Sequence, residues 1–268
     1  MNTLDWEVKG CSGESIHGTT HLPNGKPKGV VLLAHGFKGY KDYGMFPWLT
    51  EHFATLGYRA HRFNFSHSGM LGSDGPFERP DLFKNATWNT QVEDLKILCA
   101  SFAEDGLPLY LLGHSRGGTA CLLAVGRGEV DVAGVVSLSA PSACNYLAEE
   151  SKVTLLKHGF IESPSSRTDQ MLHVGLPFLQ EQLDDPPSHD ILALSASIEP
   201  QVLILHGEID PTVDVSCAVD IATAAKNATL VRVQGGNHVF NTPNPFPIDG
   251  APSSQLTTVW DAIEAWLC

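Results

Sequence analysis

Residues 107–118, "LPLYLLGHSRGG", carry the strongest structural signal in the chain. An apolar run leads into Ser115, which lies between two glycines at the spacing G-x-S-x-G, and a helix pattern rich in alanine and leucine follows. In a sharp turn from strand to helix, such glycines tolerate the close approach of the two elements, and the strained turn lifts the hydroxyl clear of the sheet. The segment therefore predicts that Ser115 is a nucleophile rather than a helix N-cap.

The rest of the chain alternates between strand-like and helix-like runs. Two short alternating stretches predict an antiparallel hairpin at 4–10 and 15–22. A nearly continuous apolar run at 30–35 predicts a strand covered on both faces. Further strands are predicted at 58–65, 108–114, 132–140, 201–207 and 229–235. Apolar residues at helical spacing predict helices at 45–57, 87–106, 116–128, 214–228 and 253–267. This order is typical of an α/β protein with a mostly parallel central sheet and helices on both faces.

One segment, 141–198, breaks the alternation. It contains no clear strand, only helix-like patches at 145–160 and 174–183. Because a structureless loop of this length is rare in a compact domain, we predict an inserted helical cap, or lid, over one end of the sheet. Residues 1–140 and 199–268 then form the core. The apolar cap residues either line an acyl or aromatic pocket or pack the cap onto the core; they are Leu172, Val174, Leu176, Phe178 and Leu179.

Composition excludes some classes of protein. A chain of 268 residues with 43% apolar residues fits one globular domain with an insertion. The formal charge of −13 and the lack of clustered basic residues argue against a nucleic-acid partner. We expect no membrane partner and no secretory signal, because no sufficiently long apolar stretch or signal-like start is present. Six scattered cysteines without CxxC pairing predict reduced thiols in a cytoplasmic protein.

A nucleophilic serine needs a base and a group that orients this base. His114 is adjacent to Ser115, but neighbouring side chains in a strand point to opposite faces, so we interpret His114 as a packing or hydrogen-bonding residue. The loop "GGNHVF" follows the last predicted strand and offers His238 as the base.

The acid is expected after the preceding strand, in "VLILHGEIDPTV". Asp210 lies in the turn where it could orient His238, while Glu208 and Asp214 are nearby alternatives, and Asp214 is suited to cap the next helix. The resulting chain order Ser, Asp, His, with each residue after a successive strand, is that of the α/β-hydrolase fold.

Acyl transfer also requires donors for the oxygen that becomes negative. We expect the backbone N–H of Arg116, at a helix N-terminus, to be one donor. The backbone N–H of Phe37, in the loop "AHGFKGYKD" after the first central strand, is the candidate for the second.

The motifs "HGFKGYKD", "RFNFSHSG", "GHSRGG", "HGEIDPTV" and "GGNHVF" occur in this order over nearly the whole chain. Together they resemble bacterial serine α/β-hydrolases of the dienelactone-hydrolase-like, cinnamoyl/feruloyl-esterase-like and acyl-peptidase-like groups. The resemblance implies Ser115 as nucleophile, Asp210 as acid, His238 as base, and Phe37 with Arg116 as oxyanion donors. Dienelactone hydrolases proper carry a cysteine nucleophile, and this chain has serine, which favours ordinary esterase chemistry.

We therefore expect a cofactor-independent serine hydrolase that cleaves small carboxylic esters, with short-chain or aromatic acyl groups, through an acyl-enzyme. An acyl-peptidase, a thioesterase or a lactonase would use the same triad, and a non-catalytic binding protein on this fold is the alternative of another class. A homodimer is compatible with the sequence.

Three further features are a group of histidines, an acidic pair and a glycine-rich stretch. A metal site built from His35, His206 and His238 is conceivable, but no HExxH-like spacing supports it, so we expect no metal. Glu93 and Asp94 are interpreted as a solvated helix face. The stretch 72–75, "GSDG", is expected to be a loop near the active-site edge.

Overall fold

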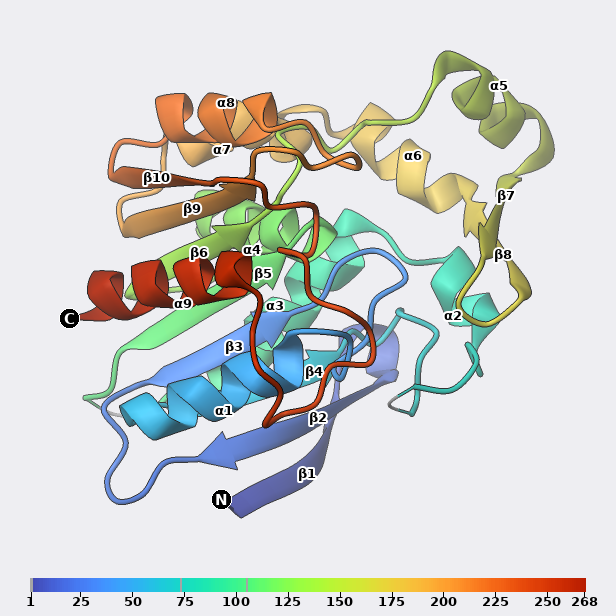
Figure 1. Ribbon diagram of the computed structural model, residues 1–268. Coiled ribbons are helices and arrows are strands. Elements are labelled where there is room, and N and C mark those ends of the chain that lie inside the picture. The colour runs from blue at the N-terminus through green and yellow to red at the C-terminus, as the bar shows by residue number, and fades with distance from the viewer. Residues whose placement is uncertain (1, 73, 105) are drawn as a thin grey trace.

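An eight-stranded sheet forms the centre of the computed structural model, which describes residues 2–72, 74–104 and 106–268 (Figure 1). Its strands are β1 (Asn2–Lys9), β2 (Ser15–Leu22), β3 (Val30–Ala34), β4 (Arg59–Asn64), β5 (Leu109–His114), β6 (Gly134–Leu138), β9 (Gln201–Gly207) and β10 (Ala228–Val233). They lie in the order β1-β2-β4-β3-β5-β6-β9-β10. Only the β1–β2 and β2–β4 pairs are antiparallel. The predicted mostly parallel sheet and the N-terminal hairpin are confirmed.

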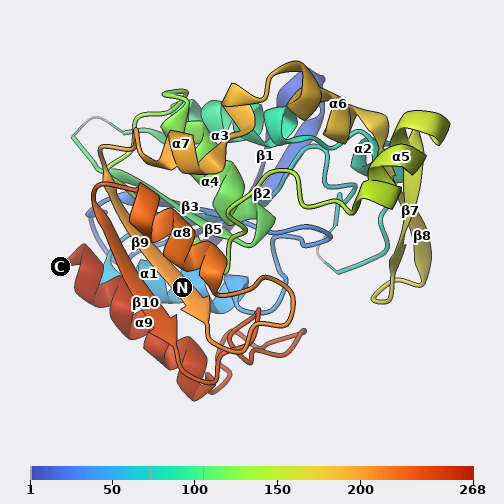
Figure 2. The ribbon, with the colours of Figure 1, turned by 90° about the horizontal axis from the view of Figure 1, so that it is seen from above.

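Helices cover both faces of this sheet, as predicted (Figures 1 and 2). One face packs against α1 (Phe46–Leu56) and α9 (Ser254–Leu267). The other packs against α3 (Trp88–Phe102), α4 (Arg116–Gly126), α7 (Ile191–Ser195) and α8 (Ser216–Ala224). Side chains of β3 alternate between the two layers, Val31 and Leu33 toward α1 and Leu32 and Ala34 toward α3 and α4. Burial on both faces explains why this strand is a continuous apolar run.

The ends of the helices follow local signals. The helix α1 ends at Gly57, whose φ of 104° is a left-handed conformation that favours glycine. Thr87 caps α3 and accepts a hydrogen bond from the Thr90 amide. This helix ends at Phe102 because Ala103 is extended, although the sequence predicted an end at 106. Asp105 in that predicted helix and Ser73 in the predicted loop 72–75 lie outside the described residues.

The inserted segment differs from the predicted all-helical cap. It contains α5 (Glu149–His158), an antiparallel hairpin of β7 (Phe160–Ser165) and β8 (Gln170–Gly175), α6 (Leu176–Asp184) and a 3₁₀ turn, η2 (Pro187–His189). The expectation that this segment holds no strand is therefore wrong. The alternation of buried Leu172 and Val174 with Met171 and His173 spans too few residues to stand out between two helix-like patches. Figure 2 shows α5, β7 and β8 at one side of the molecule, apart from the helices that flank the sheet.

The apolar residues of the cap pack it onto the core. Leu172, Val174 and Phe178 are buried and join the same apolar cluster as the residues of α3 and α4. Leu179 is also buried, and Leu176 is half-buried. A short helix that the sequence did not predict, α2 (Pro80–Lys84), packs against β8 from the core side. The packing interpretation of these cap residues therefore holds.

Two further expectations concern cysteines and membrane spans. All six cysteines are free. Within the part of the chain that the structure describes, no helix combines the length and the apolar character needed to cross a bilayer.

Asp94 is buried and connects three segments of the chain, so the expectation that it lies on a solvated helix face is wrong. Its side chain is fully buried, whereas that of the neighbouring Glu93 is exposed. The Asp94 carboxylate accepts hydrogen bonds from the Cys11 amide at 2.8 Å, the Ser66 amide at 2.8 Å and the Ser66 hydroxyl at 2.8–2.9 Å. It thus ties α3 to the N-terminal hairpin and to the loop after β4. The sequence could not show this, because the partners lie 28 and 83 residues away.

Burial raises the pKa of Asp94 to about 6, although its hydrogen bonds oppose the shift. An acid with a raised folded-state pKa destabilises the folded chain as the pH rises from the unfolded pKa, near 4, through the folded one. Relative to Asp94→Asn, the parent should therefore lose up to about 3 kcal/mol of unfolding free energy between pH 4 and pH 7. Urea denaturation at several pH values measures this difference. Glu93→Gln is the matched control, and a parent that gains stability relative to Asp94→Asn over this range would contradict the prediction.

Candidate active site

Ser115 occupies a strained turn between β5 and α4. Its φ of 54° and ψ of −124° are unusual for a residue with a side chain, and its amide donates to the Leu138 carbonyl at 2.7 Å. The glycines on both sides are required by close backbone contacts. A Cβ atom on Gly113 would lie 2.3 Å from the Gly117 oxygen, and one on Gly117 would lie 2.4 Å from the Ala34 oxygen. The predicted elbow is therefore present, with strand and helix in direct contact.

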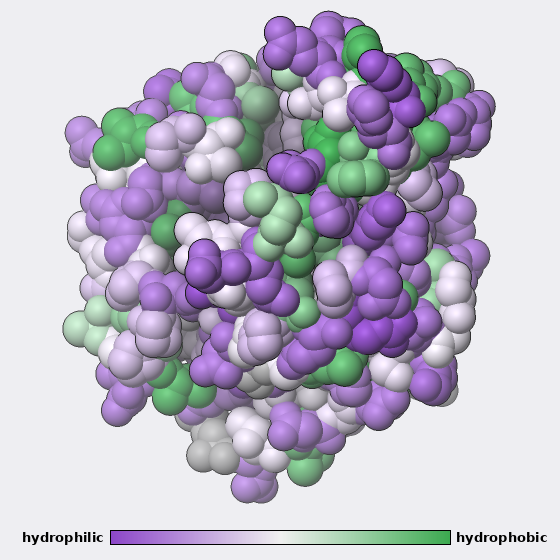
Figure 3. Space-filling model, turned by 90° about the vertical axis from the view of Figure 1, so that its right-hand side faces the viewer, coloured by the Kyte–Doolittle hydropathy of each residue, from purple (hydrophilic) through white to green (hydrophobic). Residues whose placement is uncertain are grey.

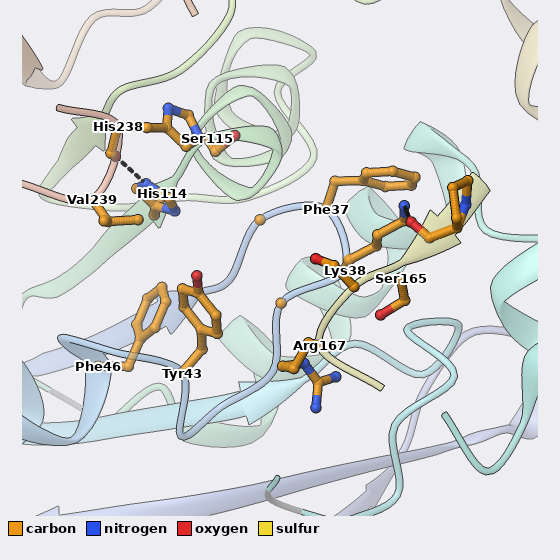
Figure 4. A pocket seen from close by; sticks show the side chains of 14 residues that line it. Phe37, Lys38, Tyr43, Phe46, His114, Ser115, Ser165, Arg167, His238 and Val239 are labelled. Carbon is orange, nitrogen blue, oxygen red and sulfur yellow. Dashed lines mark hydrogen bonds between the residues drawn. The ribbon is translucent and has the colours of Figure 1, made fainter. Parts of the chain in front are cut away.

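His238 and Asp210 come together at the same edge of the sheet. The His238 Nδ1 and the Asp210 Oδ2 are 2.7 Å apart, and the Asp210 side chain is completely buried. Two backbone hydrogen bonds hold the loops after β9 and β10 together, from Ile209 to Gly236 and from Glu208 to Val233, each at 3.0 Å. His238 and Ser115 line one cavity, in which Figure 4 shows their side chains next to each other.

The two alternative acids lie elsewhere. Glu208 forms an ion pair with Arg232 at 3.3 Å on the surface. Asp214 accepts from the Ser216 amide at 2.9 Å at the start of α8, but it lies one residue before the N-cap of this helix, Val215, which has no side-chain cap. Of the three acids, Asp210 is the one that contacts His238.

A second histidine contacts Asp210 from inside the fold. His206 is fully buried, and its Nε2 lies 3.3 Å from the Asp210 Oδ2 and 2.9 Å from the Val213 carbonyl. Burial alone would raise the pKa of Asp210, but hydrogen bonds from His206, from His238 and from the Val213 and Thr212 amides outweigh it. Together they hold this pKa well below its usual range. Sequence reasoning considered His206 only as a metal ligand and missed this contact, although the spacing "HGEID" places the two residues at one turn.

His114 and His35 support the loops around Ser115. Burial lowers the pKa of His114 to about 3 and that of His35 to about 4, so both imidazoles are neutral at pH 7. His114 donates from Nε2 to the His238 carbonyl at 2.8 Å, and the two rings are 4.8 Å apart. His35 accepts from the Phe65 amide at 3.2 Å and donates to the Gly36 carbonyl at 2.8 Å. The prediction that His114 is a hydrogen-bonding residue of the elbow agrees with these contacts.

The loop after β3 lies directly against the serine. A Cβ atom added to Gly36 would approach the Ser115 Cβ to 3.0 Å. Next to it, the Phe37 amide has no backbone hydrogen bond among the described residues, and the Arg116 amide is the first of α4, where no intrahelical acceptor exists. The two predicted oxyanion donors are therefore brought to the same place as Ser115.

Ser115 lines two cavities. The first, of about 250 Å³, is also lined by His238, Tyr43, Phe46, Lys38 and residues 164–167 at the tip of the β7–β8 hairpin (Figure 4), and we call it the hairpin chamber. The second, of about 350 Å³, which we call the Tyr146 chamber, is lined by Phe37, Ser115, Arg116, Pro141, Tyr146, Thr212, Val213, Asp214 and Cys217. None of the apolar cap residues singled out from the sequence lines either chamber. The hairpin tip and Tyr146, which do, were missed because neither carries a local signal.

The cap is fastened to the core around the hairpin chamber. Lys38 donates to the Pro164 carbonyl at 2.7 Å, and Arg167 donates to the carbonyls of Asp74 and Gly75 at 3.1 and 2.9 Å. Figure 3 looks onto this side of the molecule, where the cap stands above a hollow in which apolar side chains gather. The two chambers leave room for a small substrate next to Ser115.

No metal centre is found in the described ranges. They contain no group of three or more histidine, cysteine, aspartate or glutamate side chains that could hold an ion. The three histidines considered from the sequence, His35, His206 and His238, instead make the hydrogen bonds described above.

Comparison with known proteins defines the family. Residues 25–165 match the family model described as serine aminopeptidase, S33, a hydrolase family. This match spans more than half of the chain, so the protein belongs to that family and is an α/β serine hydrolase. No curated protein matches the sequence significantly.

Solved structures share the fold at low sequence identity. Est1E from Butyrivibrio proteoclasticus, solved with ferulic acid, is 17% identical, with a TM-score of 0.73 over 97% of this chain and 96% of the other. A putative hydrolase from Agrobacterium vitis is 19% identical, with a TM-score of 0.72 over 98% of both chains. A soluble variant of monoglyceride lipase from Saccharomyces cerevisiae, in complex with a substrate analog, is 16% identical, with a TM-score of 0.73 over 98% of this chain and 94% of the other. The structural neighbours thus include esterases and lipases.

The low pKa of Asp210 leads to a stability prediction. Because the folded-state pKa lies below the unfolded value near 4, the stabilisation by this carboxylate is present above pH 4 and is lost as the pH falls further. Asp210→Asn should lower the unfolding free energy by about 2 kcal/mol at pH 7, with a smaller deficit below pH 4. Chemical denaturation at several pH values measures the deficit, with the exposed Asp261→Asn as control. A difference in unfolding free energy between parent and Asp210→Asn that grows toward low pH would contradict the lowered pKa of Asp210.

Proposed function

We propose that the protein hydrolyses carboxylic esters through an acyl-enzyme, with Ser115 as nucleophile, His238 as base and Asp210 as the acid that orients it. The observation that carries this proposal is the 2.7 Å contact between the His238 Nδ1 and the Asp210 Oδ2 beside a serine in a strained elbow. A proton on Nδ1, donated to the carboxylate, leaves the Nε2 lone pair free to accept the serine proton.

The reaction proceeds in two halves. The Ser115 Oγ attacks the ester carbonyl while its proton passes to the His238 Nε2, and the carbonyl oxygen becomes an oxyanion held by the amides of Phe37 and Arg116. The carbon–oxygen bond to the alcohol then breaks, and His238 returns the proton to the departing oxygen. In the second half, a water molecule gives a proton to the His238 Nε2 while its oxygen attacks the acyl carbon. The bond from this carbon to the Ser115 Oγ then breaks, and His238 returns the proton to Oγ, which releases the acid and regenerates Ser115.

The two chambers suggest how the substrate lies. His238 must reach the alcohol oxygen to protonate it, and it lines the hairpin chamber, so we assign the alcohol half to this chamber. The acyl half then extends into the Tyr146 chamber, whose aromatic and aliphatic lining suits a short-chain or aromatic acid. Both chambers are small, which supports a small-molecule substrate.

An aminopeptidase is the second candidate, supported by the description of the family and by Asp214. The Asp214 carboxylate lines the Tyr146 chamber, and its pKa is lowered by a hydrogen bond from the Ser216 amide, so a charged amino group on the acyl side would find a partner. The nearby positive charge of Arg116, a residue of the same lining, opposes this. Thioesterase and lactonase activities would use the same triad. In a binding protein without catalytic activity, the triad would carry out no reaction.

Ser115→Ala should abolish hydrolysis of 4-nitrophenyl acetate, with a loss of turnover on the order of 10⁴- to 10⁶-fold, because removal of the nucleophile disables the whole triad. Steady-state kinetics with purified protein measures the loss. Ser101→Ala, which changes an exposed serine of α3, is the matched control and should keep the parent rate. A Ser115→Ala variant that works at near the parent rate would refute the assignment of the nucleophile.

A substrate panel ranks the candidate reactions. It contains 4-nitrophenyl esters of increasing chain length, methyl ferulate, an acyl-coenzyme A, a lactone and leucine 4-nitroanilide. We expect the highest kcat/KM for short-chain or aromatic esters, because the Tyr146 chamber is small and largely apolar. A preference for leucine 4-nitroanilide that Asp214→Asn removes would establish the aminopeptidase instead.

A further inference from the structure

The side chain of Arg116 is buried next to the nucleophile, and neither the family match nor the proposed mechanism uses it. The residue is 4% exposed. Its Nε donates to the Gln91 Oε1 at 2.8 Å, and its Nη2 donates to the Ala86 carbonyl at 3.4 Å. Both acceptors are neutral. Within the described ranges, the arginines that form ion pairs with carboxylates are Arg59, Arg62, Arg79 and Arg232, and Arg116 is not among them.

Three aromatic rings surround the guanidinium in place of a carboxylate. Its central carbon lies 4.7 Å from the ring centre of Phe178, 4.9 Å from that of Trp88 and 5.7 Å from that of Phe37. These distances are those of cation–π contacts, which gain strength when the cation is removed from water. The three rings come from the cap, from α3 and from the loop that carries the proposed oxyanion donor.

A buried cation without an anionic partner is a costly arrangement. Taking a charge out of water requires several kcal/mol of compensation, and buried charges are normally paired. Methionine would fill the same aromatic space without this cost. The hydrogen bonds and ring contacts of Arg116 offset only part of this cost, whereas a negative charge that exists only during the reaction gives a reason for a cation at this position.

The guanidinium of Arg116 lies where it can act on a negative charge that develops at Ser115. The backbone amide of Arg116 is one proposed oxyanion donor, so the guanidinium lies within one side-chain length of the developing oxyanion. The electrostatic influence of the guanidinium extends to the neighbouring loop. Burial is the main cause of the low pKa of His35, one residue before Gly36, and the Arg116 charge lowers this pKa further.

We propose that the guanidinium of Arg116 is a positioning residue of the oxyanion hole, which holds the Phe37 loop through its ring contact and supplies a positive charge that the transition state needs. The inference rests on the proposed function, because it requires an oxyanion at Ser115. The cation is kept unpaired by neutral acceptors and aromatic rings, so its charge is available to the reaction.

Arg116→Met tests the proposal, since it keeps the backbone amide and the buried volume and removes the charge. We expect kcat for 4-nitrophenyl acetate to fall by about 10- to 100-fold, with KM changed by less than about 3-fold, because the charge acts on the transition state and not on the neutral ester. Arg116→Lys restores the charge, and its kcat should be at least about 3-fold higher than that of Arg116→Met. The melting temperature of Arg116→Met should equal or exceed that of the parent, because an unpaired buried cation is removed.

Arg127→Met is the matched control. It is the same substitution at the other end of α4, where Arg127 is half-buried and donates to the Ser188 carbonyl and to the Asn89 side chain, away from both chambers. Its kcat should stay within about 2-fold of the parent. If Arg116→Met fails to fold, the comparison of Arg116→Lys with the uncharged Arg116→Gln decides in its place.

The outcomes separate this inference from the proposed function. If the parent shows no Ser115-dependent ester hydrolysis, the proposed function fails. If the parent hydrolyses the ester and folded Arg116→Met keeps kcat within about 3-fold, or if Arg116→Lys and Arg116→Gln lose equally, the role of the charge is refuted and the triad stands. A loss that appears only in KM would also refute it, because it would mark a contact with the substrate in its ground state.

Discussion

The site depends on one backbone contact, the crossing of β5 and α4 at Ser115. Gly113 in β5 and Gly117 in α4 lie so close together that no side chain fits between them, and Ser115, between the two glycines, has a φ of 54°. Packing on every side stabilises this strained backbone conformation, because β5 lies in the middle of the sheet and α4 is almost entirely buried. The same crossing brings the loop after β3 against the serine and the α4 amides toward the cavity. The geometry around the nucleophile is thus a consequence of sheet packing.

Electrostatics then divides the buried polar groups into neutral and charged ones. His35 and His114 are kept neutral by burial and serve as fixed hydrogen-bond donors to backbone carbonyls. Asp210 is kept ionised by the donors that converge on it. Arg116 is a cation held by neutral partners. An arrangement with one fixed anion behind the base and one fixed cation near the proposed oxyanion hole matches the charges that develop during acyl transfer.

The parts that were predictable from the sequence carry local signals. Continuous apolar runs located the sheet, and the order of strand ends predicted that Asp210 and His238 meet at one edge. Their catalytic roles, and that of Ser115, remain proposals. The hairpin at 160–175, the burial of Asp94, the contact of His206 with Asp210 and the aromatic enclosure of Arg116 were not predictable. The burial of Asp94 and the aromatic enclosure of Arg116 depend on residues that the fold brings together over tens of positions, and periodicity and spacing report only on neighbours along the chain. The strands of the hairpin are too short to stand out between helix-like patches, and a spacing of four residues between His206 and Asp210 does not by itself indicate a contact.

Covalent labelling tests the central claim most directly, because it asks whether Ser115 is a nucleophile activated by His238. The parent protein and His238→Ala are treated with a fluorophosphonate, and the modified peptide is identified by mass spectrometry. The account predicts rapid, stoichiometric labelling of Ser115 in the parent and labelling at least about 10²-fold slower in His238→Ala. Labelling at another residue, or equal rates in the two proteins, would contradict the triad. No labelling of the folded parent would support a binding role without catalysis.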